Sequence, residues 1–465
     1  MPQSIACSVI ADHQGGFMKH RRPRPPRRMI ARAVGSAGAV AVALGVGISP
    51  AMAAEKTSDQ PAATGVSPDE PGGNTAWAPE NDAAALSAKT VHPQALSSSR
   101  TTAAALQLTM PTPTGPNSVG MVGLHLVDNS RTDPYVPGTK RELMVSLWYP
   151  ATATSGHYQA PWMPSISGAH FLATRGLSPQ QVTLPKTAGH VLAPVKTSLG
   201  KLPVLLYSTG LHSDRAMGTA LAQDLASRGY LVVTVDHTHD ANEVQFPGNR
   251  LELNRMPAGT HSSDTLKVRA ADMRFVINQL GKISTGGNPD AGHATLPTGL
   301  KQSVDMSRIG MFGWSLGGAA VDNAMQLDHR IGAGANLDGQ FFGTAPSKDL
   351  DRPFMLFSSG SHNRNNDASW RTLWSHLKGY RVDIKLHGAA HQSFSDNAWM
   401  VPQEAGLLGL SQAQLQQQYG TIDPKRSVLV QSTYLAAFFG QTLSHKHSTL
   451  LDGPSSKYPE ISFVR

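Results

Sequence analysis

The stretch RIGMFGWSLGGAA, residues 308–320, constrains the fold more than any other part of the chain. Residues 309–312 are apolar and partly β-branched, as expected of a buried strand. Residues 317–320 are only glycine and alanine, so a helix formed there can pack closely against that strand. The polar Ser315 lies between these two halves. We therefore predict a strand, a sharp turn and a helix, with the Ser315 hydroxyl exposed at the turn.

The residues around this serine read Gly313-Trp314-Ser315-Leu316-Gly317, which is the pattern G-x-S-x-G. Glycine at both ends removes Cβ atoms that would clash in so tight a turn. The pattern is typical of the nucleophile elbow of α/β-hydrolases, in which the serine is the attacking group. A glycine-rich turn whose serine only caps the following helix would look the same. A catalytic role therefore requires a general base and an acid elsewhere in the chain.

Strand-like and helix-like segments alternate from about residue 118 onward. Apolar, strand-like runs lie at 143–150, 202–208, 230–236, 331–337, 352–359 and 380–387. Helix-like segments lie at 216–229, 266–280, 368–379 and 426–443. Such alternation predicts an α/β fold of the α/β-hydrolase type, with a mostly parallel central sheet and helices on both faces. In these sheets reactive side chains collect at the carboxyl ends of the strands.

The carboxyl ends of the later strands provide an acid and a base. A serine hydroxyl needs an imidazole to accept its proton and a carboxylate to orient that imidazole. In α/β-hydrolases these residues follow in the order Ser, acid, His. Asp338 directly follows the strand at 331–337, and His391 follows the strand at 380–387. We therefore predict Ser315 as nucleophile, Asp338 as acid and His391 as base.

Other acids and histidines fit these roles less well. Asp322 lies on the helix after the serine, where its side chain is expected to face away from the turn. His387 lies within a predicted strand, and His362 and His376 lie in or before a polar helix. We therefore expect these four side chains to be structural.

The negative charge that develops on an ester's carbonyl oxygen needs two N–H donors. We predict the backbone N–H of Leu316, which follows the nucleophile, and that of Leu211, which follows the strand at 202–208. Residues 209–213 would also suit an ordinary glycine turn. Since the sequence has no H-E-x-x-H motif and no cysteine-rich ligand set, we expect neither a metal nor another cofactor.

Residues 18–53 have the features of a secretory signal. A basic stretch precedes an apolar segment at 33–48 and small residues at Ala51 and Ala53. The apolar segment is shorter than the ~20 residues that a transmembrane span needs. Cleavage after Ala53 would remove seven of 40 Lys and Arg and one of 32 acidic residues, which lowers the formal net charge from +8 to +2. We therefore expect export by Sec or Tat to an extracellular location, no transmembrane anchor and no nucleic-acid partner.

Composition divides the chain into three regions. These are a leader with signal peptide at 1–53, a flexible linker at 54–110 rich in Ala, Ser, Thr, Pro and Gly, and a catalytic domain at 111–465. The single cysteine, Cys7, lies in the leader, so the catalytic domain is expected to have no disulfide.

Several motifs, in order along residues 110–445, resemble the platelet-activating factor acetylhydrolase family of the plasma and intracellular type II kind. They are VSLWYP, LPVLLYSTGLHSD, DLASRGYLVVTVDHTHDA, RIGMFGWSLGGAA, ANLDG and HGAAHQSFSD. The resemblance implies the same three catalytic roles for Ser315, Asp338 and His391, and calcium-independent hydrolysis of a short or oxidised sn-2 acyl ester. His237 and Asp240 match a family segment at a strand end, where they would support either the site or only the fold.

Two positions depart from the family's usual pattern. Thr209 stands where the family has a histidine before the oxyanion glycine, and Trp314 stands where it has a histidine before the nucleophile. We expect both residues, together with Gln392, to line the substrate pocket, and Trp314 to shorten the acyl slot. The segment at 399–415 carries several apolar residues that would either meet a lipid surface or pack against the sheet.

The leading hypothesis is a secreted serine esterase whose substrates are short-acyl phospholipids. A broad extracellular lipase, esterase or polyester hydrolase would use the same catalytic residues. A non-catalytic binding module built on a hydrolase fold is the third hypothesis. The full set of candidate triad residues argues against it, because such modules commonly lose the serine or the histidine.

Overall fold

The computed structural model describes residues 104–465. The expected leader, signal peptide and most of the expected linker lie outside the described residues. The end of that linker is a correction to our prediction. Leu106–Gln107 forms strand β1, which pairs with β5 (Val182–Thr183), and Leu108 is buried in an apolar cluster with Trp162 and Phe171. The folded part therefore begins before residue 111, because Leu106 and Leu108 pack in this cluster. The sequence did not indicate this, because both leucines lie among polar and small residues.

One large sheet forms the centre of the described region. Its strands are β2 (Ser118–Thr132), β3 (Lys140–Ala151), β4 (Gln159–Pro161), β6 (Lys186–Val191), β7 (Leu202–Ser208), β8 (Leu231–Val235), β11 (Val304–Trp314), β12 (Ile331–Leu337), β13 (Phe354–Ser358), β14 (Arg381–Leu386) and β15 (Ile461–Phe463). Their order across the sheet is β15-β14-β13-β12-β11-β7-β8-β3-β2-β6-β4. The neighbours from β14 to β8 all run parallel, and β3 pairs antiparallel with β8 and β2. A short hairpin, β9 (Glu243–Gln245) and β10 (Leu251–Leu253), lies outside this sheet.

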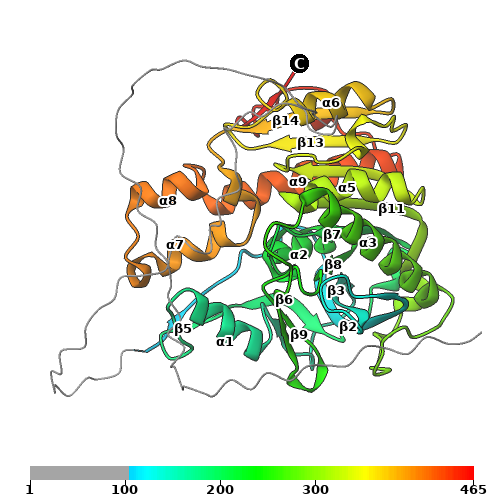
Figure 1. Cartoon of the computed structure of the whole chain (residues 1–465), viewed down its shortest axis with the longest axis vertical. Coiled ribbons are helices and arrows are strands. Elements are labelled where there is room, and N and C mark those ends of the chain that lie inside the picture. The colour runs from blue at the N-terminus through cyan, green and yellow to red at the C-terminus, as the bar shows by residue number, and fades with distance from the viewer. Residues whose placement is uncertain (1–103) are drawn as a thin grey trace, which may run out of the picture. The chain divides into compact units, whose positions relative to one another are not determined.

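Helices cover both faces of the sheet (Figure 1). They are α1 (Ser165–Thr174), α2 (Thr219–Ser227), α3 (Ser262–Ser284), α4 (Leu300–Ser303), α5 (Leu316–Leu327), α6 (Ala368–His376), α7 (Asn397–Leu408), α8 (Gln412–Tyr419) and α9 (Pro424–Ser444). The apolar sides of α3, α5 and α6 pack into one core cluster, and those of α2 and α9 pack into a second. These two clusters are the two faces of the sheet, so the predicted α/β architecture is confirmed.

The central strands end where the sequence predicted, to within a few residues. The strands at 202–208 and 331–337 have the predicted bounds, and the strand before Ser315 extends to Trp314. Because β7, β11 and β12 are neighbours in the parallel part of the sheet, their carboxyl ends lie side by side. Within residues 104–465, no helix is both long and apolar enough to cross a bilayer.

Candidate active site

Ser315 lies on a sharp turn between β11 and α5, as predicted. Its φ of 56° and ψ of −127° place a non-glycine residue in a conformation that costs free energy and is held by its surroundings. Glycine at 317 is required there, because a Cβ on that residue would collide with the Ser208 carbonyl. A Cβ on Gly339 would likewise collide with the carbonyl of Ser315. Close backbone contact from two neighbouring strand ends therefore fixes the serine.

The three predicted triad residues converge at this turn. The Nε2 atom of His391 lies 3.0 Å from Ser315 Oγ, and its Nδ1 atom lies 2.8 Å from Asp338 Oδ2. Asp338 directly follows β12, and His391 opens the short 3₁₀ helix η5 (His391–Phe394) after β14. A carboxylate beside Nδ1 holds the ring N–H on that side, so Nε2 faces Ser315 as the proton acceptor, which is the arrangement that nucleophilic catalysis needs.

Asp338 has a second histidine partner that the sequence did not reveal. His362, which follows β13, lies with Nδ1 3.0 Å from Asp338 Oδ1 and with Nε2 2.8 Å from Asp367 Oδ2. Its ring centroid is 4.5 Å from that of Trp370. We expected His362 to be structural from its polar surroundings. Its position after the parallel strand next to β12 was the signal that would have placed it beside the acid.

These contacts set the charges around the acid. Burial would raise the pKa of Asp338, but hydrogen bonds with His362 and His391 outweigh it and hold that pKa well below its usual range. Burial would lower the pKa of His362, but its hydrogen bonds with Asp338 and Asp367 raise it to about 9. At neutral pH the acid is therefore a carboxylate and His362 an imidazolium between two carboxylates.

The two predicted oxyanion donors follow two neighbouring parallel strands, β11 and β7. Leu316 is the first residue of α5, where backbone N–H groups have no acceptor within the helix. Leu211 lies in the loop that follows β7, and its N–H has no hydrogen-bond acceptor among residues 104–465. Two unused main-chain donors next to a nucleophile are what an oxyanion site requires.

A buried arginine holds the loop that carries Leu211. The Arg269 guanidinium donates to the carbonyl oxygens of Thr209 and Gly210 and pairs with Asp240 at 2.7 Å. Asp240 in turn accepts a hydrogen bond of 3.1 Å from the N–H of His212. Asp240 therefore supports the loop through Arg269, a residue that sequence reasoning missed because it lies some 60 residues away on α3.

His237 holds the end of β7 rather than the loop. Its Nε2 lies 2.9 Å from Ser208 Oγ, and its Nδ1 lies 3.0 Å from Asp272 Oδ2. Asp272 also pairs with the fully buried Arg141 at 2.6 Å. This buried network fixes the strand from which the loop starts.

The three residues that we expected to line the substrate pocket differ in how far they are exposed. Trp314 is only 4% exposed, its indole N–H donates to the His391 carbonyl at 3.0 Å, and its ring packs 5.3 Å from the imidazole. A Cβ on Gly210 would lie 2.7 Å from the same indole. Thr209 is fully buried, whereas Gln392 is partly exposed. Trp314 therefore packs against His391 and against the loop that carries Leu211. Our expectation that it projects into an open acyl slot is not supported.

Apart from His362, the rejected alternatives do not join the site. Asp322 is buried on α5, and burial raises its pKa to about 7. His376 pairs with Asp349, and His387 contacts Ser462. None of these has a contact with Ser315 among the described residues.

Several known proteins are similar to this chain over most of its length. The family model "Platelet-activating factor acetylhydrolase, isoform II" matches residues 102–452. A probable 1-alkyl-2-acetylglycerophosphocholine esterase of Arthroderma benhamiae is 30% identical over 387 residues, which cover 76% of this chain and 93% of that protein. The platelet-activating factor acetylhydrolase of Cavia porcellus is 24% identical, over 62% of this chain and 69% of its own.

A solved structure is also similar over most of the chain. The ferulic acid esterase of Streptomyces cinnamoneus superposes with a TM-score of 0.66 and is 32% identical. The match covers 77% of this chain and 99% of that enzyme. The fold is therefore that of an α/β-hydrolase esterase.

Proposed function

Because the chain belongs to the platelet-activating factor acetylhydrolase, isoform II, family, we propose that it cleaves short sn-2 acyl esters of phospholipids with Ser315, His391 and Asp338. The chain is a carboxylic ester hydrolase of the 1-alkyl-2-acetylglycerophosphocholine esterase type. The observation that carries the proposed roles is the contact of one imidazole with Ser315 Oγ at 3.0 Å and with Asp338 at 2.8 Å.

The proposed reaction runs in two halves. His391 Nε2 takes the proton of Ser315 as Oγ attacks the acyl carbonyl carbon, and the N–H groups of Leu211 and Leu316 stabilise the resulting oxyanion. The oxyanion collapses as the lysolipid alkoxide leaves, protonated by His391, and an acyl-serine remains. Water then attacks this ester with His391 again as base, which releases the short acid and restores the Ser315 hydroxyl.

Two measurements test the residue roles. Ser315→Ala removes the attacking oxygen with little loss of packing, so hydrolysis of a chromogenic acetyl ester and labelling by a fluorophosphonate are expected to fall on the order of 10³-fold or more. Labelling of this variant at the wild-type rate would contradict the assignment of the nucleophile.

Because no step uses a metal, dialysis against EDTA is expected to leave the rate of ester hydrolysis unchanged. A loss of activity that calcium or zinc restores would contradict this mechanism.

A second substrate class is favoured by one observation. The ferulic acid esterase is as similar to this chain as the lipid esterase is, at 32% against 30% identity. A broader esterase that accepts aromatic or polyester substrates is therefore the alternative. Comparison of kcat/KM for sn-2 acetyl and sn-2 palmitoyl phosphatidylcholine, methyl ferulate and a soluble polyester decides between them. The proposal predicts the highest value for the acetyl lipid.

We also propose that the protein is exported and that it acts on aggregated lipid. Export is supported by the signal-like residues 18–53, and the test is sequencing of the N-terminus of protein recovered from culture medium, expected at Ala54. Lipid contact is supported by α7, which begins close after His391 and exposes Leu407 to solvent by 48%. Met400 and Val401 of the same helix are buried, and Met400 packs in the apolar cluster that contains Trp162 and Phe171.

A further inference from the structure

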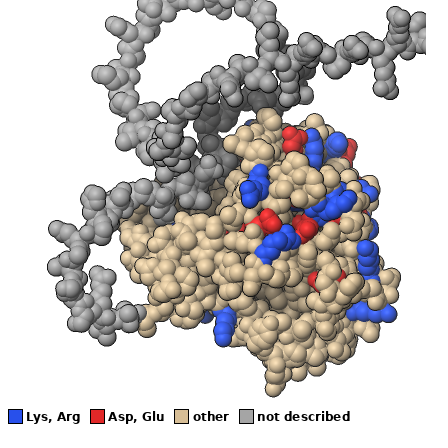
Figure 2. Space-filling view, turned by 60° about the horizontal axis from the view of Figure 1, so that its bottom comes forward, with Lys and Arg blue, Asp and Glu red and all other residues tan. Residues whose placement is uncertain are grey.

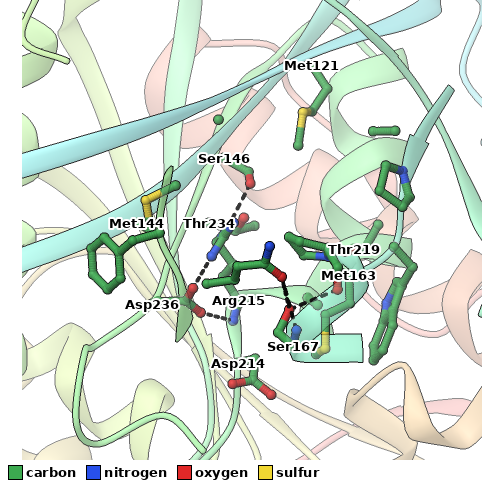
Figure 3. Close-up of a pocket in the computed structure, with 18 of the residues that line it drawn as sticks. Met121, Met144, Ser146, Met163, Ser167, Asp214, Arg215, Thr219, Thr234 and Asp236 are labelled. Atoms are coloured by element: carbon green, nitrogen blue, oxygen red, sulfur yellow. Dashed lines mark hydrogen bonds and ion pairs between the residues drawn. The ribbon is translucent and has the colours of Figure 1, made fainter. Parts of the chain in front are cut away.

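A cavity of about 380 Å³, drawn in Figure 3, is lined by none of the three proposed catalytic residues. It is lined by residues of β3, η2 (Arg215–Gly218), β9 and the start of α1, and by neither Ser315 nor His391. Its walls are mainly apolar and include Met121, Trp148, Trp162 and Phe246. Exposed residues at its edge, among them Tyr158 and Pro247, open it to the surface. Its volume lies within the range of small-molecule sites, which are also mostly apolar with a few polar groups.

The cavity is lined by three buried acidic side chains and one basic side chain, which are those of Asp214, Asp236, Glu243 and Arg215. Arg215 is committed to Asp236, which accepts from both its guanidinium and its backbone N–H, and to Ser146 Oγ at 3.0 Å. Asp214 lies apart from this pair, as Figure 3 shows, and is 4% exposed. Glu243 is 3% exposed. The cavity therefore holds two carboxyl groups, of Asp214 and Glu243, that receive no hydrogen bond from Arg215.

One of these carboxyl groups has an oxygen without a partner. Glu243 Oε1 lies 3.4 Å from His170 Nδ1, but Glu243 Oε2 is buried and has no hydrogen bond among the described residues. Asp214 Oδ1 accepts only the backbone N–H of Glu243, at 3.1 Å. A buried acceptor without a donor is destabilising, so Glu243 Oε2 favours a ligand that brings an N–H group.

We propose that this cavity binds a protonated primary amine that carries an apolar chain, with its ammonium group beside Asp214 and Glu243. An ammonium group supplies three N–H donors and a positive charge. One donor would bond to Glu243 Oε2, and the charge would offset the excess of acidic over basic side chains in the cavity. The apolar chain packs along the methionine and tryptophan side chains of the wall. This site is separate from the proposed esterase reaction and does not rest on it.

The basic and acidic groups that face these carboxyls determine how pH affects binding. They are Arg215, His170 and Arg175 on the basic side and Asp236 on the acidic side. Burial and the neighbouring carboxylates raise the pKa of Asp214, and burial raises the pKa of Glu243. Both groups therefore lose their negative charge as the pH falls, so amine binding is expected to tighten as the pH rises from 5 to 8.

Titration calorimetry of the whole protein with n-hexylammonium chloride tests this proposal. Hexanol and hexanoate provide a neutral and an anionic probe of the same chain length. We expect hexylammonium to bind with a Kd at least tenfold lower than either. Equal affinity for hexylammonium and hexanol at pH 8 would overturn the proposal.

Variants locate the site. Asp214→Asn and Glu243→Gln keep the size of each side chain and are each expected to raise the Kd for hexylammonium about tenfold, while the exposed Asp349→Asn is expected to leave it unchanged. Wild-type affinity in both cavity variants would contradict the assignment. Should the variants fail to fold, the three probes on the wild-type protein still decide, since equal affinity for hexylammonium, hexanol and hexanoate is incompatible with carboxylate recognition.

Discussion

Asp338 lies between two histidines, and each of its oxygens has a fixed partner. Oδ2 faces the His391 imidazole at 2.8 Å, whereas Oδ1 accepts the backbone N–H of Ser359 at 2.7 Å and faces His362 at 3.0 Å. A carboxylate held at both oxygens cannot rotate away from the base. The orientation of His391 toward Ser315 is therefore set by contacts that reach beyond the triad itself.

Asp338→Asn tests the acid. The amide keeps the size of the side chain but favours the wrong tautomer of His391, so kcat is expected to fall on the order of 10³-fold or more. Asp322→Asn is the matched control, because Asp322 is equally buried yet has no contact with the site. If hydrolysis of a soluble acetyl ester proved sensitive at Asp322 and insensitive at Asp338, the acid would be misassigned.

His362→Gln tests the second partner of the acid. Loss of a hydrogen bond to a charged group is expected to lower kcat about tenfold with KM unchanged, since Asp338 becomes less firmly held. Because the pKa of His362 is raised from 6.5 to about 9 in the folded protein, its contribution to stability is full below pH 6.5 and is lost as the pH rises through about 9.

Melting temperatures between pH 6 and pH 10 measure that contribution. The wild-type Tm is expected to fall more steeply across this range than the Tm of His362→Gln. His376→Gln, which removes an exposed pair with Asp349, is expected to keep the wild-type slope. Parallel slopes in the wild-type protein and in His362→Gln would show that His362 is not charged between its two carboxylates.

At the scale of elements, β11, the turn and α5 act as one unit whose geometry depends on glycine. Gly317→Ala would place a methyl group against the Ser208 carbonyl, which is backbone and cannot move aside. We expect a loss of about 1–3 kcal/mol in the free energy of unfolding, as for overpacking, together with lower activity. Gly406→Ala, where nothing lies within 4 Å of the added Cβ, is the control and is expected to be stabilising by about 0.5–1 kcal/mol. Chemical denaturation of both variants measures the difference, and equal stability would contradict the role of Gly317.

The strands before Ser315 and Asp338 were predictable because they are buried on both faces and so read as nearly continuous apolar runs. The strand before His391, RVDIKL, was predictable from its alternation of polar and apolar residues. Position after a strand then located Asp338 and His391. Contacts made across the molecule were not predictable in this way. Arg269 donates to the loop after β7 from a helix that is distant in the sequence. Trp314 packs against His391, although its position next to the nucleophile suggested that it lines the pocket. Strand β2 was missed because its half-exposed pattern, with glycines at 120 and 123, resembles a loop.

At the scale of the whole described region, charge is unevenly distributed. On the face drawn in Figure 2, the Lys, Arg, Asp and Glu side chains gather toward one side and leave a broad area without them. Helices α1, α7 and α8 together contain one acidic residue and no Lys or Arg. That residue, Glu404, is buried and pairs with Arg175 at 3.0 Å. An uncharged surface beside the base suits contact with a lipid aggregate, where burying a charge would cost free energy.

Leu407→Glu tests contact of α7 with lipid. Leu407 is 48% exposed, so inserting it between lipid head groups would gain up to about 1 kcal/mol, which a carboxylate forfeits. We expect kcat/KM on sn-2 acetyl phosphatidylcholine in vesicles to fall at least threefold, with no change on a soluble acetyl ester. Leu327→Glu is the matched control, since Leu327 is 43% exposed at the end of α5 opposite Ser315. A change on the soluble ester alone, or equal losses in both variants on vesicles, would rule out a specific lipid contact through α7.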